Sequence, residues 1–506
     1  MHSGNATIPE LAEYLTNTVS VMLDLRAGKG WNILMKGMTL EAVTQAVKGI
    51  YTGPEEAKKS ELSAITIDSR QVEKDGLFVA IKGARVDGNT FVPGAYEDGA
   101  VCCMSTEPPK DETRPYIQVE SCEQALKDMA EFYRSLLEIP VVGITGSVGK
   151  TTTKEMIAAV LSQKYDTLKT LGNFNNEIGL PLTIFRIREH HQAAVLEMGI
   201  SDFGEMTRLA KVAKPDICVI TNIGQCHLEN LGTRDGILKA KTEIFTYLKP
   251  EGKAVLNGND DKLCTLDQDE RISAPVFYGL PDGGKLDQTK EGARLSVYAQ
   301  NCESLGLAGS RFMLHTPKGE ISVTVPAPGR HMISNALAAA AVGIQLGLSL
   351  EQIKTGIESY EPVGGHGHII QTETMTIMDD CYNANPVSMK AGLDVLHEVE
   401  ESRTVAVMGD MFELGDEEAQ MHYEVGQYAA QKGISLIISI GSLAQNYEKG
   451  IEEISRKEGY TGRHLWFADL DAFLEKGIRE IRKGDAVLVK ASHAMHFEKI
   501  VKALQE

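Results

Sequence analysis

Hydrophobic and polar positions along the chain predict buried strands that alternate with helices. An apolar run at residues 140–144 is typical of a buried parallel strand, and a glycine-punctuated turn and a helical pattern at 151–161 follow it. Apolar runs at 193–199 and 216–223 predict two more strands. This alternation favours a parallel sheet, whose ligands bind beyond the carboxyl ends of its strands.

The same rhythm returns nearer the carboxyl terminus. Apolar runs at residues 375–380, 404–408, 436–440 and 485–491 predict strands with helices between them, and polar clusters follow several of these strands. Between the two α/β regions, residues 276–328 are strand-rich, and the Pro-Ala-Pro-Gly cluster at 326–329 indicates a domain boundary. A helix is predicted at 331–346.

The turn after the first central strand predicts a nucleotide site. Five residues separate Gly143 from Gly149, one more than in the usual phosphate-binding loop (P-loop), so the match is to a variant; the alternative is a glycine-rich turn with an incidental Gly-Lys-Thr. In a P-loop, Lys150 would reach the β- and γ-phosphates and Thr151 would hold Mg²⁺. The predicted nucleotide-binding residues are Gly146, Ser147, Val148, Gly149, Lys150, Thr151 and Thr152.

Together these patterns predict an α/β protein of three domains. Residues 35–138 would form a small N-terminal α/β domain with strands at 62–70 and 76–81 and a linker helix. Residues 139–328 would form a central P-loop domain with a parallel sheet, and residues 329–506 a doubly wound, Rossmann-like domain. Because Met35 and the helical pattern after it resemble a natural start, we interpret residues 1–34 as a non-native or appended extension.

Composition narrows the function classes. The formal net charge of −19 repels nucleic acids and anionic membranes, so neither is an expected partner. The eight cysteines form no C-x-x-C pair, which is typical of reduced cytosolic thiols and not of a zinc or disulfide framework. No apolar run approaches the ~18 residues of a membrane span, and no secretory signal is visible. We expect a cytoplasmic, monomeric protein.

Other polar residues suit phosphate, metal or substrate, each with a simpler alternative. Glu197 lies at the end of its predicted strand, His227 follows the next one, and both would join Lys150 at one sheet edge. The amide-rich loop at 173–181 fits a substrate contact or plain turn chemistry. Arg70 beside Ser69 fits an anion contact or an ordinary surface arginine, and Lys241, on a helix predicted at 237–248, fits a solvated face.

These stretches together resemble the Mur ligase family of peptidoglycan synthesis, over residues 35–506. The most family-specific are the loop Gly-Ser-Val-Gly-Lys-Thr-Thr-Thr-Lys at 146–154, the loop at 173–181, Glu197-Met198-Gly199 and Ala240-Lys241-Thr242-Glu243. Residues 380–389 and 409–415 are most similar to the family member that adds D-alanyl-D-alanine (D-Ala-D-Ala) to UDP-N-acetylmuramoyl-tripeptide (UDP-MurNAc-tripeptide).

The resemblance implies ATP and Mg²⁺ as cofactors and a third domain that closes over the nucleotide. It matches Glu197 to the carboxylate ligand of a first metal and His227 to a ligand of a second metal. It matches Lys241 to a lysine that is often carbamylated and then acts as a carboxylate-like ligand. Asn335 matches an adenine contact and Asp380 a ribose or nucleotide contact. The substrate-binding residues expected are Ser69, Arg70, Asn175, Asn176, Asn383 and Asn385.

Two positions depart from the family's pattern. His366 and His493 stand where many members carry arginine, and a mostly neutral histidine cannot offer the charged, bidentate fork of arginine. The reaction implied is phosphorylation of the tripeptide carboxylate by ATP, followed by attack of the dipeptide amine. The alternatives left open are a Mur ligase that adds another amino acid and a P-loop nucleotide switch.

Overall fold

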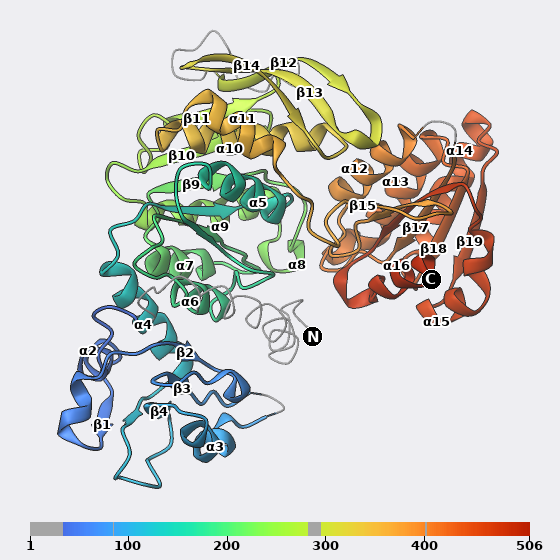
Figure 1. Ribbon diagram of the computed structural model, residues 1–506. Coiled ribbons are helices and arrows are strands. Elements are labelled where there is room, and N and C mark those ends of the chain that lie inside the picture. The colour runs from blue at the N-terminus through green and yellow to red at the C-terminus, as the bar shows by residue number, and fades with distance from the viewer. Residues whose placement is uncertain (1–33, 84–85, 282–294, 400–401) are drawn as a thin grey trace.

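The computed structural model describes residues 34–83, 86–281, 295–399 and 402–506. Three sheets organise them, one in each of three domains, and Figure 1 shows the first domain below the central one and the third beside it. The predicted extension, residues 1–34, lies outside the described residues except for Leu34. Within the described part of the chain, no helix is long and apolar enough to cross a membrane.

The first domain has a five-stranded sheet of order β1-β5-β4-β3-β2, in which only the β1–β5 pair is antiparallel. The strands are β1 (Ile50–Thr52), β2 (Ile65–Thr66), β3 (Leu77–Val79), β4 (Cys102–Ser105) and β5 (Tyr116–Gln118), and the helices are α2 (Leu40–Ala46), α3 (Val92–Glu97) and α4 (Cys122–Ser135). The strand predicted at 62–70 is much shorter, because Asp68 accepts the Arg70 N–H and turns the chain into a 3₁₀ helix.

The central sheet has nine strands in the order β14-β13-β12-β11-β10-β9-β6-β8-β7. Strands β6 to β12 pair in parallel, and β12, β13 and β14 form an antiparallel extension. The strands are β6 (Val141–Thr145), β7 (Thr167–Lys169), β8 (Ala193–Glu197), β9 (Ile217–Ile220), β10 (Lys253–Asn257), β11 (Val276–Gly279), β12 (Leu295–Ser304), β13 (Ser310–Thr316) and β14 (Gly319–Val325). The parallel sheet predicted from the alternating pattern is therefore present.

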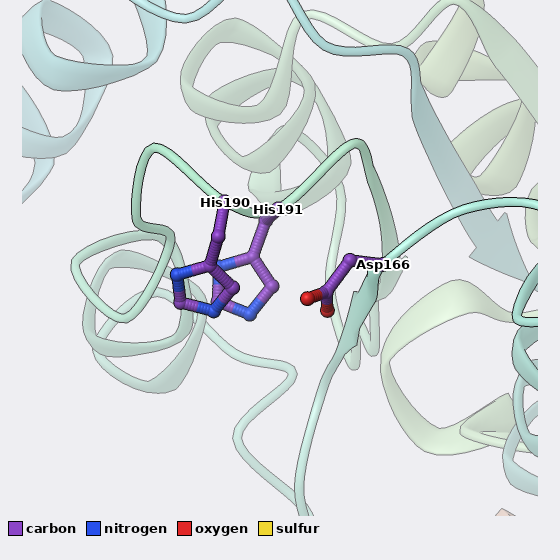
Figure 2. Close-up of side chains that lie close together, drawn as sticks. All are labelled: Asp166, His190 and His191. Atoms are coloured by element: carbon purple, nitrogen blue, oxygen red, sulfur yellow. The ribbon is translucent and has the colours of Figure 1, made fainter. Parts of the chain in front are cut away.

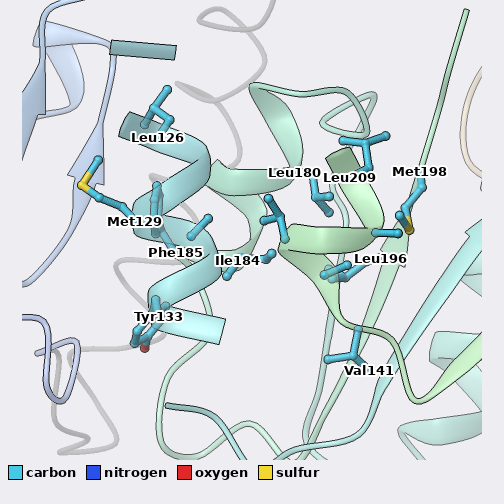
Figure 3. Close-up of a cluster of buried hydrophobic side chains, with 14 of the residues drawn as sticks. Leu126, Met129, Tyr133, Val141, Leu180, Ile184, Phe185, Leu196, Met198 and Leu209 are labelled. Atoms are coloured by element: carbon cyan, nitrogen blue, oxygen red, sulfur yellow. The ribbon is translucent and has the colours of Figure 1, made fainter. Parts of the chain in front are cut away.

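Helices cover both faces of this sheet, which explains why its strands are apolar on both sides. One face packs against α4, α6 (Gly179–Ile184), α7 (Glu205–Ala213) and α9 (Arg234–Thr242), the other against α5 (Lys150–Leu161). Figure 3 shows Leu126, Met129 and Tyr133 of α4 against Ile184 and Phe185. Tyr133 donates to the Ile187 carbonyl at 2.7 Å, so the helix predicted as a linker is fixed to the central domain.

The boundary predicted at residues 328–329 needs correction. Helices α10 (Arg330–Gln345) and α11 (Leu350–Glu358) follow it, and their apolar residues belong to the central core beside α5. Gly343 and Gly356 allow the close approach, since a Cβ on either would lie within 3.0 Å of Val160. Burial of the alanine-rich α10 against a sheet that lies earlier in the chain decides its domain, and the third sheet begins only at β15 (His368–Gln371).

The third domain has a six-stranded sheet of order β15-β16-β20-β17-β18-β19, parallel except for β15. Its other strands are β16 (Thr376–Asp379), β17 (Arg403–Gly409), β18 (Leu436–Ile440), β19 (Arg463–Phe467) and β20 (Asp485–Lys490). Helices α12 (Pro386–His397), α13 (Glu418–Gln431) and α14 (Gln445–Glu458) cover one face, and α15 (Leu470–Ala472) and α16 (Glu498–Gln505) the other. This is the predicted doubly wound arrangement.

Candidate active site

A cavity of about 450 Å³ lies between the carboxyl edge of the central sheet and the third domain. Of the residues predicted to form the site, those that line it are Ser147, Val148, Gly149, Lys150, Thr151, Thr152, Asn175, Asn176, Glu197, His227, Asn335, Asp380, Asn383 and Asn385. The structure therefore brings most of the predicted residues to one place. Gly146, Lys241, Ser69 and Arg70 are not part of the cavity wall.

The phosphate loop is held by the strand beside it. Gly146 has φ 151°, and a Cβ there would lie 1.9 Å from Thr221 Oγ1, so only glycine fits. The Asn222 side chain binds both the N–H and the carbonyl of Val148, each at 3.0 Å. Gly149, with φ 80°, turns the chain into α5. The sequence analysis did not single out Asn222, although it lies two residues after the end of β9, at the predicted edge.

Lys150 folds back on this loop. Its Nζ donates to the Gly146 carbonyl at 2.9 Å, and Thr151 and Thr152 follow it in the first turn of α5. The N–H groups in the first turn of a helix have no carbonyl partner within the helix. Together with the positive end of the helix dipole, they favour an anion at the start of α5. The arrangement can therefore hold the phosphates of a nucleotide with Lys150 at their edge.

Glu197 is a buried carboxylate with one oxygen in use. Its Oε1 accepts a hydrogen bond from Asn175 Nδ2 at 2.9 Å, whereas its Oε2 has no hydrogen-bond partner among the described residues. Lys154 Nζ lies 3.7 Å from Oε2, and also 3.1 Å from Glu155. Lys154 was not predicted to belong to the site, although it lies one helical turn after Lys150. A buried carboxylate oxygen in this state is suited to a cation.

Lys241 is buried, in contrast to the solvated face that its helix alone suggested. It lies four residues after Ile237 on the inner face of α9, and its side chain is 1% exposed. Burial lowers the pKa of its amine to about 8, and the nearby charge of Lys150 contributes in the same direction. Lys239 on the same helix is exposed. The helix also ends at Thr242, earlier than the predicted 248, and continues as a 3₁₀ segment.

His227 meets a residue of the third domain. Its Nδ1 lies 2.6 Å from Glu413 Oε2, in the loop after β17. Both residues have a left-handed backbone, with φ 53° and 63°. Glu413 lay inside a stretch quoted for the family resemblance but was not among the predicted site residues.

Several predicted polar contacts are already engaged within the protein. Asn335 Oδ1 accepts the Thr153 hydroxyl at 3.2 Å, which ties α10 to α5 beside the phosphate loop. Asn176 Oδ1 accepts the backbone N–H of Gly179 at 2.8 Å, and Asn385 caps α12 by accepting the Ser388 N–H at 3.0 Å. Asn383 Oδ1 accepts the Ala384 N–H at 2.8 Å. These amides shape the cavity wall as well as facing it.

The third-domain wall centres on the ion pair of a buried lysine and on three aromatic rings in tilted contact. Lys490, 1% exposed, donates to Asp380 Oδ2 at 2.6 Å and to the Asn383 carbonyl at 3.0 Å. The ring of Tyr382 lies 4.4 Å from that of His366 and 5.1 Å from that of His493. Burial lowers the pKa of His366, which keeps its ring neutral. The two histidines that depart from the family's pattern thus flank one tyrosine.

Ser69 and Arg70 lie in the first domain, in the 3₁₀ segment Ser69–Gln71. Arg70 is exposed, and its Nη2 and Nε bind the Asp68 carboxylate at 2.9 and 3.0 Å. The pair does not line the cavity, so a contact with substrate there would belong to a separate, distal part of a long ligand.

Another possible set of metal ligands lies at the opposite edge of the central sheet. Asp166 precedes β7, and His190 and His191 precede β8, so all three are at amino ends of strands (Figure 2). Their ligand atoms lie within 4.8 Å of one another. However, His191 Nδ1 accepts the Arg188 N–H at 2.9 Å, and a neutral ring that does so carries its proton on Nε2. His191 then has no spare lone pair, and we assign no metal to this group.

Comparison with known proteins identifies related families and structures. Three family models match: "Mur ligase family, catalytic domain" over residues 61–134, "Mur ligase middle domain" over 144–343 and "Mur ligase, glutamate ligase domain" over 368–493. The chain is 36% identical to UDP-N-acetylmuramoyl-tripeptide–D-alanyl-D-alanine ligase of Bacillus subtilis, covering 92% of this chain and 98% of that protein. It is 35% identical to the Escherichia coli protein of the same name, covering 93% and 99%.

Solved structures agree in fold. MurF from Acinetobacter baumannii superposes with a TM-score of 0.81 at 32% identity, covering 92% of this chain and 98% of that one. MurF ligase from Thermotoga maritima in complex with ADP superposes with a TM-score of 0.74 at 26% identity, covering 87% and 97%.

Proposed function

The chain belongs to the Mur ligase family, and we propose that it is an ATP-dependent ligase that joins D-Ala-D-Ala to UDP-MurNAc-tripeptide. The observation that carries this proposal is the cavity, which joins a phosphate loop and a buried carboxylate of one domain to a polar wall of another. The relatives favour neither a ligase for another amino acid nor a nucleotide switch.

The chemistry requires activation, because an amine does not displace oxide from a carboxylate at neutral pH. One oxygen of the tripeptide's terminal carboxylate attacks the γ-phosphorus of ATP, and ADP leaves. The dipeptide amine then attacks the acyl carbon, loses a proton, and inorganic phosphate departs with that oxygen. Lys150 offsets charge on the transferring phosphoryl group from its place on the phosphate loop. Most of the catalysis is the positioning of three substrates in a closed cavity.

We propose that two Mg²⁺ ions bind at this site, and that Thr151, Glu197, His227 and a carbamylated Lys241 supply their protein ligands. The unpartnered Oε2 of Glu197 fits such an ion, since carboxylate oxygens are the ligands that Mg²⁺ prefers. When bound, Mg²⁺ neutralises charge on the phosphates. The lowered pKa of the Lys241 amine supports carbamylation, because only a neutral amine combines with CO₂.

The remaining predicted contacts keep the roles that the family suggests. We propose that Asn335 and Asp380 contact the nucleoside of ATP, that Asn175, Asn176, Asn383 and Asn385 contact the peptide substrates, and that Ser69 and Arg70 contact the UDP end. For the asparagines and Asp380, hydrogen bonds to neighbouring groups support fixed side-chain positions. We also propose a monomer, and a cytoplasmic location, where ATP is supplied.

The test is phosphate release from ATP with Mg²⁺, run with UDP-MurNAc-tripeptide alone, D-Ala-D-Ala alone, and both together. Tripeptides ending in lysine and in diaminopimelate are both supplied. We expect release only with both substrates, and a product heavier than the tripeptide by the dipeptide minus water. Equal release in every tube would instead indicate a bare nucleotidase, and ligation of a free amino acid would indicate another ligase.

A further inference from the structure

His227 and Glu413 form a contact between domains whose two sides are each held firmly. On the central side, the loop that carries His227 is tied to the phosphate loop: Ser147 N–H donates to the Asn222 carbonyl at 3.0 Å, and Gly224 N–H donates to Ser147 Oγ at 2.9 Å. A movement of the phosphate loop therefore carries the His227 loop with it.

On the other side, the loop of Glu413 is fixed inside the third domain. Asp410 is buried and accepts the Ala444 N–H at 2.7 Å, the Met411 N–H binds His422 Nε2 at 2.9 Å, and the Phe412 N–H binds Ser492 Oγ at 3.0 Å. Because these partners come from three different elements, the position of Glu413 reports the position of the whole third domain.

The two loops also approach closely as backbones. A Cβ on Gly415 would lie 3.6 Å from the N atom of Glu229, and Leu228 packs against the apolar core of the third domain. His227 and Glu413 both keep left-handed backbone conformations, which are uncommon for residues other than glycine and cluster at functional sites. In these conformations the two side chains are in contact.

The chemistry of the pair determines which ring nitrogen is available. An ionised carboxylate only accepts hydrogen bonds, so the 2.6 Å contact with Oε2 places a proton on His227 Nδ1. In a neutral ring the lone pair is then on Nε2. A metal-binding histidine generally donates its other N–H to a carboxylate or carbonyl, which fixes the ring and raises its basicity.

We propose that Glu413 is a positioning residue that reaches from the third domain to hold His227 Nδ1–H and leave Nε2 to the metal. The metal position at His227 is then completed only when the third domain is docked on the central domain. This inference rests on the proposed function, since it takes His227 as a metal ligand. It couples closure over the dipeptide to assembly of the phosphoryl-transfer site.

The test uses Mn²⁺ in place of Mg²⁺, titrated into the full-length protein with a non-hydrolysable ATP analogue and followed by electron paramagnetic resonance. Glu413→Ala is compared with Glu413→Gln, which keeps an acceptor, and with His227→Ala. The matched control is Glu398→Gln, because Glu398 also makes an interdomain contact, with Ser304 Oγ at 3.0 Å, away from His227.

We expect His227→Ala to abolish binding of one Mn²⁺ ion. Glu413→Ala should weaken the binding of that same ion by about 10- to 100-fold. Glu413→Gln should have a smaller effect and Glu398→Gln none. In ligation, Glu413→Ala should lower kcat more than it raises KM for the dipeptide, and excess Mg²⁺ should restore part of the rate, which a purely structural defect would not allow.

The inference would be overturned if Glu413→Ala bound Mn²⁺ as tightly as the wild type while His227→Ala lost the ion. It would also be overturned if His227→Ala bound Mn²⁺ like the wild type, because His227 would then not be a metal ligand. In either case the proposed function is tested separately, by whether the wild-type protein releases phosphate only when both substrates are present.

Discussion

The two walls of the cavity are built by different means. The central wall is a backbone structure, in which Val148 and Ser147 are held by Asn222 from the loop after the neighbouring strand β9. The third-domain wall is a side-chain structure, in which Lys490 at the end of β20 pairs with Asp380 just after β16, and the ring of Tyr382 contacts that of His493 at a tilt. A backbone site for anions depends on one short motif, whereas a side-chain wall depends on which strand ends the topology brings together.

Removing charge from the central wall should have the largest effect. Lys150→Ala deletes the ammonium group that lies against the phosphate loop, and we expect ligation to fall by at least about 10²–10³-fold. Initial rates with all substrates saturating measure this. Lys164→Ala is the matched control, since Lys164 lies just beyond the far end of α5 and binds the carbonyls of Leu346 and Gly347. Near-normal turnover of a folded Lys150→Ala protein would refute the assignment.

Glu197→Gln should lower kcat by about 10²-fold and raise the Mg²⁺ concentration needed for half-maximal rate. The substitution removes Oε2, which has no hydrogen-bond partner among the described residues, as a cation ligand. Lys154 keeps its ion pair with Glu155 at 3.1 Å. A Mg²⁺ titration of the ligation rate provides the measurement. Glu155→Gln is the control, because Glu155 also pairs with Lys154 but lies outside the cavity wall. An equal rise in the required Mg²⁺ concentration in that control would argue against Glu197 as a ligand.

Lys241→Met should lose activity, by about 10- to 100-fold, yet gain stability. Because its pKa falls from 10.5 to about 8 on folding, the buried ammonium costs on the order of 3 kcal/mol at neutral pH. The unfolded chain binds more protons between these two values, so the wild-type free energy of unfolding should rise with pH from about 8 to 10.5 in CO₂-free buffer.

Urea unfolding at several pH values checks this, with Lys239→Met as the exposed control on the same helix. The rise should vanish in Lys241→Met and persist in Lys239→Met. A separate ¹³C-bicarbonate NMR spectrum should show a carbamate carbon that Lys241→Arg lacks. If the free energy of unfolding rose equally with pH in all these proteins, Lys241 would not be buried as an amine.

The smallest effect is expected on the third-domain wall. His366→Gln should change the ligation rate by less than about 5-fold, since the neutral ring contributes packing on Tyr382 and no charge. Because folding lowers the pKa of His366, the unfolded chain binds more protons, and stability should fall as pH drops below about 6.5. Unfolding at pH 5.5 and 7.5 should show a smaller fall in His366→Gln than in wild type or the exposed His397→Gln. A large loss of activity would mean that this wall acts through charge after all.

The sequence predicted the central wall well because its chemistry follows from local order. Lys150, Glu197 and His227 each lie at or after the carboxyl end of a strand of one parallel sheet, and such ends share an edge. Asn335 entered only through family resemblance, since its partner Thr153 is 182 residues away. For Lys241 the helical pattern alone indicated a solvated face, because a lysine is rarely buried, and only the family resemblance indicated a metal ligand. Its spacing from Ile237 nevertheless placed it on the inner face of the helix.

The third-domain wall and the domain boundary could not be derived in this way. The Pro-Gly cluster before α10 is a real break in the chain, but contacts with α5 from an earlier segment decide where α10 belongs. Likewise, nothing near Glu413 in the sequence indicates His227, because the contact exists only once two domains have docked.

The most direct test of a cavity that joins ATP to a carboxylate is the fate of one oxygen atom. UDP-MurNAc-tripeptide labelled with ¹⁸O in its terminal carboxylate is ligated to D-Ala-D-Ala, and the released phosphate is analysed by mass spectrometry. The account predicts one ¹⁸O in each phosphate, because the attacking carboxylate oxygen leaves with the phosphoryl group. Unlabelled phosphate alongside ligated product would show that ATP is cleaved by water and would contradict it.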